Sequence, residues 1–333
     1  MRLTINQLAL ARSSRGVQRY AELLLPGIRE GIARARGVVE TLAPGSSSIR
    51  DRGREWMYRT DGNEWLWTPC QRGSLVAHHQ VITVHDCINI EHVHRDDWRI
   101  GPFMAIFNRI LHRAQVVVAI SEATRAAVLR CYRVDPEKVV VIRSPSDLPL
   151  ASANRRPPEL PLPFVLMVTN ALPHKNTLLA CRALAASRLP REGLSLCSVG
   201  TLSAEARQVC VQAGIRLVEC QSIDDATLGA LYRDCAFLFS PSLAEGHNLA
   251  IAEARCAGAP VLCSDIPVHR EFFEGQVTFF DPTELDAAVQ ALESIWVAMG
   301  PQATRVPAVF GRGVDSVVAD YLDLFGRLDE RYQ

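Results

Sequence analysis

Residues 241–260 read PSLAEGHNLAIAEARCAGAP, and this stretch gives the strongest indication of the fold. The apolar run before it predicts a strand that ends at Pro241, and a loop containing Glu245 follows. A helix is then expected until Gly258, and Pro260 prevents the helix from continuing. A strand, a loop and a helix in this order form the repeating unit of parallel α/β sheets.

The predicted start of this helix combines an anion-binding terminus with two acidic side chains. Backbone N–H groups of residues 247–249 lie in the first turn, where aligned peptide dipoles leave about half a positive charge that attracts phosphate. Glu245 and Glu253 are eight residues apart, which a helical rise of ~1.5 Å per residue converts into ~12 Å at most. This separation matches the two hydroxyl-rich ends of a nucleotide sugar, and each carboxylate can accept two hydroxyl groups.

The same alternation of strands and helices extends outward along the chain. In the first half, strands are expected at 3–8, 81–84, 116–120 and 138–142, and helices at 16–32, 101–113 and 123–131. In the second half, strands are expected at 164–168, 194–199, 215–218, 237–239 and 261–263, and helices at 175–186, 226–235, 249–257 and 314–328.

A stretch without periodicity separates the two halves. Residues 145–163 contain six prolines, which disfavour helices and central strands, so this stretch is expected to be an interdomain linker. At 333 residues the chain is long for one α/β domain, and it is sufficient for two domains of about 150 residues each. The sequence therefore predicts an α/β fold with two doubly wound, Rossmann-like domains that face each other across a cleft.

The composition narrows the classes of protein to consider. The formal net charge is zero, but residues 1–150 hold 21 Lys and Arg against 15 Asp and Glu, while residues 151–333 hold 15 against 21. A basic first half suits an anionic partner, although nothing indicates a nucleic acid. The ten cysteines form no C-x-x-C pair and several lie in apolar runs, which favours a reducing compartment. No apolar run reaches the ~18–20 residues that a membrane-spanning helix needs.

The acidic pair and the residues after it resemble a known family. Glu245 and Glu253, then Gly258-x-Pro260, then SDIPV and RE at 264–268 and 270–271, are similar to the retaining glycosyltransferases of family 4, which have the GT-B fold. Within that family the chain is most similar to transferases of bacterial O-antigen and exopolysaccharide assembly. The resemblance implies that Glu245 contacts the hydroxyl groups of the donor sugar and that Glu253 contacts the ribose. The donor-binding residues implied in this segment are Glu245, Gly246, His247, Asn248, Leu249 and Glu253.

Two further stretches of the second half follow in the order of the family. Residues 167–176 resemble the strand, loop and helix that hold a phosphate-binding lysine, so Lys175 is expected to neutralise the leaving diphosphate and to stabilise the transition state. Many relatives have an arginine where this chain has Asn170, which is also expected to contact the donor. Gly200 and Ser222 lie in segments that resemble the loops around the nucleobase. Ser222 or the nearby Asp224 can equally cap the helix that follows.

Three stretches of the first half also match the family. Residues 15–20 resemble the glycine loop of the family that faces the donor, and at Gly16 the missing side chain would permit close backbone approach. His85-Asp86 resembles the His-Asp pair of the family, and its histidine is expected to donate to a sugar hydroxyl or to the departing oxygen. Ser121 matches another strand end, where we expect it to cap the next helix.

These matches predict a two-domain hexosyltransferase that retains the anomeric configuration. Residues 1–147 are expected to bind the acceptor, 148–163 to form the linker and 164–310 to bind the nucleotide sugar, while 311–333 form a helix that packs back toward the first domain. The predicted catalytic residues are His85, Lys175 and Glu245. The resemblance alone implies retention.

The resemblance to polysaccharide mannosyltransferases implies GDP-mannose as the donor, with UDP-hexoses and dTDP-rhamnose left open. The expected acceptor is a glycan or an undecaprenyl-diphosphate-linked oligosaccharide. We expect a cytoplasmic protein that associates peripherally with the inner face of the membrane through its basic first half. Neither a cofactor nor a metal is expected.

Other functions would require other sequence motifs. Metal-dependent transfer needs chelating carboxylates, but no Asp-x-Asp occurs, and His92, His94 and Asp96 fall in a polar, loop-like segment. No G-x-G-x-x-G follows the first strand, which argues against a nicotinamide dehydrogenase. A non-hydrolysing nucleotide-sugar epimerase shares the two-domain architecture but needs acid and base residues in the first domain. Asn170 and Asn248 depart from the family pattern, so a non-catalytic sugar-nucleotide-binding subunit of a transferase complex is a further alternative.

Overall fold

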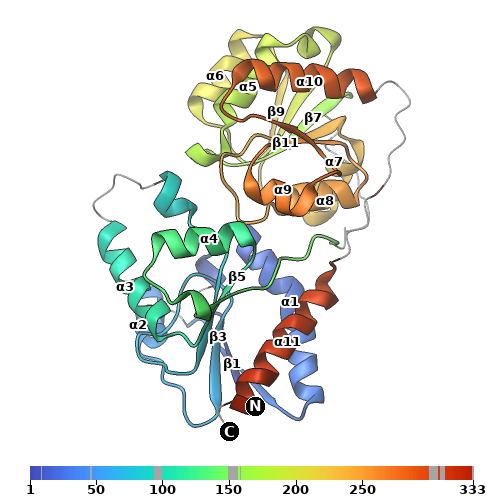
Figure 1. Cartoon of the computed structure of the whole chain (residues 1–333). Coiled ribbons are helices and arrows are strands. Elements are labelled where there is room, and N and C mark those ends of the chain that lie inside the picture. Colours follow the sequence, from blue (N-terminus) through green and yellow to red (C-terminus); the bar gives the residue numbers. More distant parts are fainter. Residues whose placement is uncertain are drawn as a thin grey trace. The chain divides into compact units, whose positions relative to one another are not determined.

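The chain forms two compact units, each built around its own parallel sheet (Figure 1). Unit 1 comprises Met1–Pro145 and Arg312–Gln333, and unit 2 comprises Ser146–Gly311. The computed structural model describes residues 1–8, 10–45, 47–93, 100–148, 157, 159–299, 307 and 312–331. Much of the predicted linker 148–163 thus lies outside the described residues.

Unit 1 has a six-stranded parallel sheet in the order β2-β1-β3-β4-β5-β6. Its strands are β1 (Arg2–Asn6), β2 (Val38–Leu42), β3 (Glu64–Thr68), β4 (Gln80–Val84), β5 (Val116–Ala119) and β6 (Val139–Val141). Its α-helices are α1 (Arg15–Arg34), α2 (Ser48–Trp56), α3 (Ile100–Arg113), α4 (Glu122–Cys131) and α11 (Val314–Arg331).

Helices cover both faces of this sheet, and its central strands β3, β4 and β5 are buried along their whole length. Tyr20 of α1 and Tyr321 of α11 pack with Trp65 and Trp67 on one face. Phe107 of α3 lies in the cluster of the other face, together with residues of α4. The sequence of α11 is the last in the chain, yet it belongs to unit 1 and lies beside α1 (Figure 1).

Glycine allows this close approach of α1 and α11. A Cβ atom on Gly31 would lie 2.2 Å from the Cδ1 atom of Leu322, which is shorter than any ordinary contact. The tyrosine hydroxyl groups of Tyr20 and Tyr321 are 3.0 Å apart, and Tyr321 also lies 2.8 Å from the Thr83 hydroxyl. The buried hydroxyl groups are therefore satisfied within unit 1.

Unit 2 has a second six-stranded parallel sheet in the order β12-β11-β10-β7-β8-β9. Its strands are β7 (Phe164–Val168), β8 (Ser195–Val199), β9 (Leu217–Cys220), β10 (Phe237–Ser240), β11 (Val261–Ser264) and β12 (Thr278–Phe280). Its α-helices are α5 (Thr177–Ala186), α6 (Ala204–Gln212), α7 (Asp225–Asp234), α8 (Leu249–Cys256), α9 (Pro267–Phe273) and α10 (Leu285–Met299).

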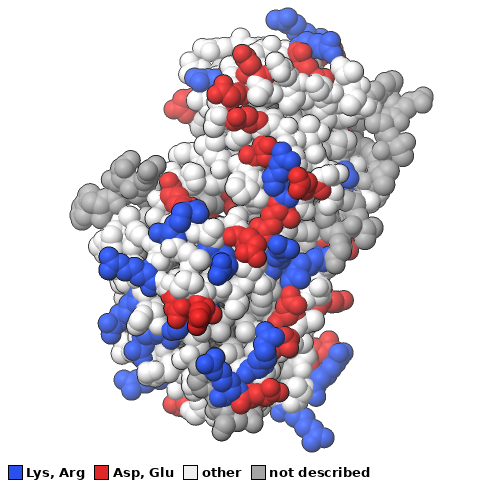
Figure 2. All heavy atoms as spheres, viewed as in Figure 1, with Lys and Arg blue, Asp and Glu red and all other residues white. Residues whose placement is uncertain are grey.

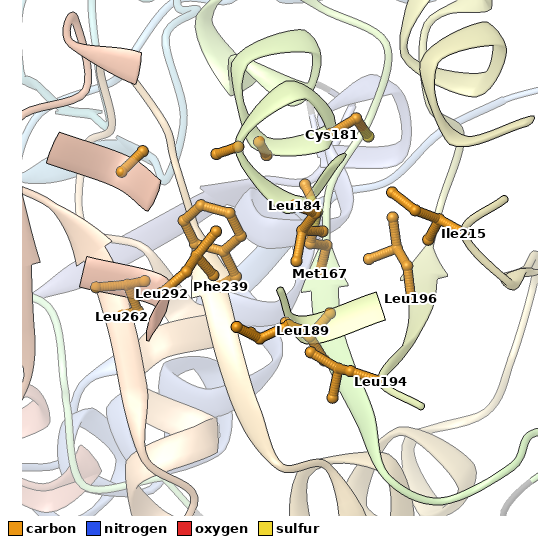
Figure 3. Packing of buried hydrophobic residues seen from close by; sticks show 14 of the residues in the cluster. Met167, Cys181, Leu184, Leu189, Leu194, Leu196, Ile215, Phe239, Leu262 and Leu292 are labelled. Carbon is orange, nitrogen blue, oxygen red and sulfur yellow. The ribbon is translucent and has the colours of Figure 1, made fainter. Parts of the chain in front are cut away.

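One apolar cluster holds the sheet of unit 2 to α5, α6 and α10 (Figure 3). Met167 of β7 and Phe239 of β10 point into it from the sheet, and Leu184 and Leu292 point into it from α5 and α10. Figure 1 shows α7, α8 and α9 on the opposite face. This packing fixes the strands, and the loops after their carboxyl ends are fixed in turn.

The helices and strands agree with most of the sequence predictions. The strand predicted at 164–168 has the bounds of β7, and the helix predicted at 249–257 ends one residue later than α8. The predicted start of α5 was wrong by two residues, because a 3₁₀ turn occupies Pro173–Lys175 before the helix begins at Thr177. The elements that the sequence did not predict are β2, α2, β3, α6, α9, β12 and α10. Within the described ranges, no helix has the length and apolar composition that crossing a bilayer requires.

Candidate active site

The loops after the central strands of unit 2 carry most of the residues predicted to bind the donor. Ligands of parallel α/β proteins bind outside the carboxyl ends of the strands, where the strand order reverses. Asn170 and Lys175 follow β7, Gly200 follows β8 and Glu245 follows β10. Because β7 lies between β8 and β10, these three loops leave neighbouring strands at one edge of the sheet.

Lys175 and Glu245 form an ion pair between two of these loops. Lys175 Nζ donates to Glu245 Oε1 at 2.6 Å, and the side chains are only 18% and 10% exposed. The Leu243 N–H group also donates to the His174 carbonyl at 2.7 Å, which joins the same loops through the backbone. Burial alone raises the pKa of Glu245, but Lys175 and a hydrogen bond from Ser242 outweigh burial and hold the pKa below its ordinary value. Glu245 is therefore a carboxylate at neutral pH.

Lysine is rare in this chain. Of the 36 basic residues, only Lys138 and Lys175 are lysines. The ammonium group is a compact charge with three donors, whereas the arginine fork is planar. Lys175 can therefore keep its bond to Glu245 and donate to a second acceptor, such as a phosphate oxygen.

Asn248 shapes the turn that precedes α8. Its backbone lies in the left-handed region with φ = 83°, which asparagine tolerates better than most residues with a side chain. Its amide group donates to Ser240 Oγ at 2.9 Å and to His269 Nε2 at 3.0 Å. His269 Nδ1 in turn donates to the Ser264 carbonyl at 2.8 Å. The turn is thus attached to the ends of β10 and β11.

The protonation of His269 follows from these contacts. Burial lowers the pKa of His269 to about 4, so the ring is neutral at neutral pH. A carbonyl can only accept, so Nδ1 carries the proton and Nε2 accepts from Asn248. The Asn248 side chain makes no cap with the first turn of α8. The backbone N–H groups at a helix start without such a cap can bind an anion.

Glu253 lies one turn further along α8 and is held from a neighbouring helix. The hydroxyl group of Tyr232 in α7 donates to Glu253 Oε2 at 3.0 Å. Burial, with the Glu253 carboxylate second, raises the pKa of Tyr232 well above its ordinary value, so this hydroxyl stays protonated and keeps donating. One oxygen of Glu253 is thereby fixed in position.

Gly200 has a backbone that no other residue can adopt at this place. Its φ is +98°, and a Cβ atom would lie 2.0 Å from the Thr169 carbonyl oxygen. The loops after β7 and β8 therefore touch through their backbones. Ser222 is also left-handed, with φ = 55°. Asp224, rather than Ser222, caps α7 by accepting from the Thr227 N–H group at 2.7 Å.

The side chain of His247 points into unit 2. It is 4% exposed, and its ring packs edge-on against Phe272 with the ring centroids 4.3 Å apart. His247 Nε2 lies 3.1 Å from Ser146 Oγ. Burial lowers the pKa of His247 to about 3. Only the backbone of this residue is thus suited to the predicted contact with the donor.

Gly16 and His85 belong to unit 1. Gly16 lies in the first turn of α1. His85 follows β4, is 5% exposed and packs edge-on against Tyr20. Its Nε2 donates to the Pro69 carbonyl at 3.0 Å, and burial lowers its pKa to about 4. A neutral ring that donates through Nε2 can only accept through Nδ1, so the chemistry predicted for His85 changes from donating to accepting.

The remaining predictions concern structural roles and metal binding. Ser121 caps α4, as expected, by accepting from the Thr124 N–H group at 2.9 Å. His92 is exposed, and His94 and Asp96 lie outside the described residues. Among the described residues, no group of three or more His, Cys, Asp or Glu side chains is placed to hold a metal ion.

The sequence patterns missed three residues that shape this site. Ser240 and His269 hold Asn248, and Ser146 contacts His247. His269 falls at the variable position of the stretch 264–271. Its place in the first turn after Pro267 was the available signal, because a neutral histidine at a helix start can reach the preceding strand end.

Two family models match the chain. Residues 153–297 match the model described as glycosyl transferases group 1, and residues 68–148 match the model described as glycosyltransferase family 4. Together the matches cover more than half of the chain. The chain belongs to these glycosyltransferases.

Solved structures show that this glycosyltransferase has the GT-B fold. A structure of Anabaena Alr3699/HepE in complex with UDP and glucose is 16% identical with a TM-score of 0.63, covering 99% of this chain and 98% of that one. Sucrose-phosphate synthase from Thermosynechococcus elongatus is 14% identical with a TM-score of 0.65, covering 99% and 97%. The lipopolysaccharide outer core galactosyltransferase WaaB in its apo form is 12% identical with a TM-score of 0.56, covering 100% and 99%. No curated protein sequence matches the glycosyltransferase.

Proposed function

We propose that this glycosyltransferase moves a hexose from a nucleotide-diphosphate donor to a glycan or lipid-linked acceptor, with retention of the anomeric configuration. In this proposal residues 164–310 bind the donor and residues 1–147 bind the acceptor. The observation that carries it is the Lys175–Glu245 ion pair beside the first turn of α8. This arrangement offers a cation and backbone donors to a diphosphate, and a carboxylate to a sugar.

Each group has a distinct task in the transfer. Negative charge grows on the diphosphate as the glycosidic bond breaks, so Lys175 and the first turn of α8 stabilise the transition state. Glu245 accepts hydrogen bonds from the hydroxyl groups of the hexose, and Glu253 accepts from the ribose. His85 accepts a hydrogen bond through Nδ1 from a sugar hydroxyl group. Asn170, Gly200 and Ser222 complete the donor site as backbone and amide contacts.

The resemblance to mannosyltransferases supports GDP-mannose as the donor. The similar structure of Alr3699/HepE was solved with UDP and glucose, so a uridine donor is the direct competitor. Thermal unfolding in the presence of GDP-mannose, UDP-glucose, UDP-galactose and dTDP-rhamnose separates these donors. We expect one of them to raise the unfolding temperature and the others to leave it unchanged.

We further propose a cytoplasmic protein that meets an undecaprenyl-diphosphate-linked acceptor at the membrane surface. The excess of basic residues in the first half, 21 against 15 acidic ones, supports attraction to an anionic acceptor. Figure 2 shows Lys and Arg side chains spread over the visible face of unit 1 and interleaved with Asp and Glu. We therefore expect weak, salt-sensitive sedimentation with anionic vesicles and none with neutral vesicles.

Product analysis tests the reaction. With the stabilising donor and a lipid-linked acceptor, we expect release of nucleoside diphosphate and a product whose anomeric proton has the configuration of the donor. Conversion of the donor without an acceptor would identify an epimerase instead. Donor binding without nucleotide release for any acceptor would identify a non-catalytic subunit.

A further inference from the structure

The first connection between the units joins unit 2 at Ser146, directly after Pro145 of unit 1. Three contacts attach this segment to α8 and to the turn before it. Ser146 Oγ lies 3.1 Å from His247 Nε2. Cys256 Sγ accepts from the Leu148 N–H group at 3.4 Å and donates to the Ser146 carbonyl at 3.5 Å. The segment is thus held at both ends of α8.

The direction of the contact between Ser146 and His247 follows from the second ring nitrogen. His247 Nδ1 is buried and has no hydrogen-bond partner. A buried donor without a partner is costlier than an acceptor with an unused lone pair, so the proton sits on Nε2. His247 therefore donates to Ser146 Oγ. Because its pKa is about 3, the ring stays neutral and the bond persists through the ordinary pH range.

The contact of Cys256 with the Ser146 carbonyl also depends on a protonated group. Burial raises the pKa of Cys256, with the nearby Asp147 and Glu253 carboxylates adding to the effect. The thiol therefore stays protonated and can donate to the Ser146 carbonyl. The contacts of Ser146 and Leu148 with α8 thus do not depend on an ionised group.

His247 cannot move independently of the turn to which it belongs. Its ring packs against Phe272 and Phe273, with centroid distances of 4.3 Å and 5.8 Å, and the residue is 4% exposed. Close-packed protein interiors transmit displacement, because they contain few voids that could absorb it. A shift of the turn at residues 245–249 therefore displaces Ser146 through His247.

We infer that His247, Ser146 and Cys256 are positioning residues that couple donor binding at residues 245–249 to the first connection between the units. This inference rests on the proposed function, in which the same turn holds the donor diphosphate. The connection would then respond to the donor before any acceptor is present. The side chain of His247 acts through Ser146 rather than on the substrate. The predicted contact of His247 with the donor involves only its backbone.

Hydrogen exchange at the connection tests the coupling. The probe is GDP-mannose or UDP-glucose, whichever stabilises the wild-type protein more. In the wild type the donor should slow exchange of the Leu148 amide, whose N–H group is bonded to Cys256. Ser146→Ala should bind the donor with nearly the same affinity but lose this slowing. Its kcat should fall roughly three- to tenfold, the value of one hydrogen bond, while its KM for the donor stays unchanged.

Matched variants separate coupling from a general loss of stability. Ser144→Ala removes a buried serine of unit 1 two residues earlier and should behave as the wild type. Ser146→Thr keeps the hydroxyl group and should keep the coupling. The double variant Ser146→Ala/His247→Phe removes both polar groups but keeps the aromatic packing, so it should fold and still lack the coupling.

Two results would overturn the inference. One is donor bound to the wild type without any change in exchange at Leu148. The other is a Ser146→Ala protein that shows the same donor-dependent slowing and the same kcat as the Ser144→Ala protein. If no nucleotide sugar binds the wild type at all, the proposed function itself is wrong, and the inference fails with it.

Discussion

The ammonium group of Lys175 lies 2.6 Å from the carboxylate of Glu245, and the two residues come from loops after the adjacent strands β7 and β10. The pair holds the two loops together where the strand order of the sheet reverses. Glu245 orients the ammonium group of Lys175, and Lys175 holds the pKa of Glu245 below its ordinary value despite burial. In the proposed function, a donor that binds at this edge of the sheet meets both charges already in place.

Removal of either charge should reduce turnover steeply. Lys175→Met keeps the aliphatic stem but loses the cation, and Glu245→Gln keeps the shape but loses the charge. We expect each to raise the barrier by about 2–4 kcal/mol, as for other groups that stabilise developing charge. Initial rates of nucleoside diphosphate release measure the effect. Lys138→Met, which replaces the other lysine, is the control and should have the rate of the wild type.

The two glycines Gly193 and Gly200 allow a matched test of the contact between loops. Both have positive φ, +88° and +98°, but a Cβ atom on Gly193 has nothing within 4 Å, whereas one on Gly200 meets the Thr169 carbonyl at 2.0 Å. Gly193→Ala should lower the free energy of unfolding by about 1–2 kcal/mol through backbone strain alone. Gly200→Ala should cost more, because the backbone must also move. Urea unfolding measures the stability of both variants. Equal losses of stability would show that the loop after β8 can move to accommodate the added Cβ atom without further cost.

The loops of this site were easier to predict from the sequence than the frame around them. Motifs that can be recognised from their residue types contain Glu245, Lys175 and Gly200. β3 reads EWLWT and is buried on both faces, so no alternation marks it, and Glu64 looks like a surface residue. In fact Glu64 accepts from the hydroxyl groups of Thr4 and Tyr58, a pairing that only the folded chain reveals. His269 was missed for the same reason, because its partner Asn248 is far away in sequence.

Acid should destabilise unit 2 through its buried histidines. Burial lowers the pKa of His247 to about 3 and that of His269 to about 4, below the ordinary 6.5. The unfolded chain therefore binds more protons than the folded one below pH 6.5, and stability is lost as the pH falls from there.

The variant His247→Phe isolates one of these groups. It keeps the packing against Phe272 but has no proton to bind, so its stability should fall by about 2 kcal/mol less than that of the wild type between pH 7 and pH 5. Urea unfolding at both pH values measures the difference. His112→Gln, at an exposed position, should follow the wild type. Parallel pH curves for the wild type and His247→Phe would show that His247 is accessible to protons in the folded state.

Tyr232→Phe should weaken donor binding without affecting the chemical step. The change removes the hydroxyl group that donates to Glu253 Oε2 at 3.0 Å and leaves the ring in place. Because Glu253 is proposed to bind the ribose, we expect the KM for the donor to rise roughly three- to tenfold, with kcat nearly unchanged. Steady-state kinetics at varied donor concentration decide this. A fall in kcat at constant KM would show instead that the contact of Glu253 with the donor forms only in the transition state.

The most direct test is an experimental structure of the chain with its stabilising nucleotide sugar. The diphosphate oxygens should lie about 2.7–3.2 Å from Lys175 Nζ and from backbone N–H groups of residues 247–249. The hexose hydroxyl groups should contact Glu245. A nucleotide bound elsewhere, with Lys175 still donating only to Glu245 and the first turn of α8 without an anion, would contradict the account.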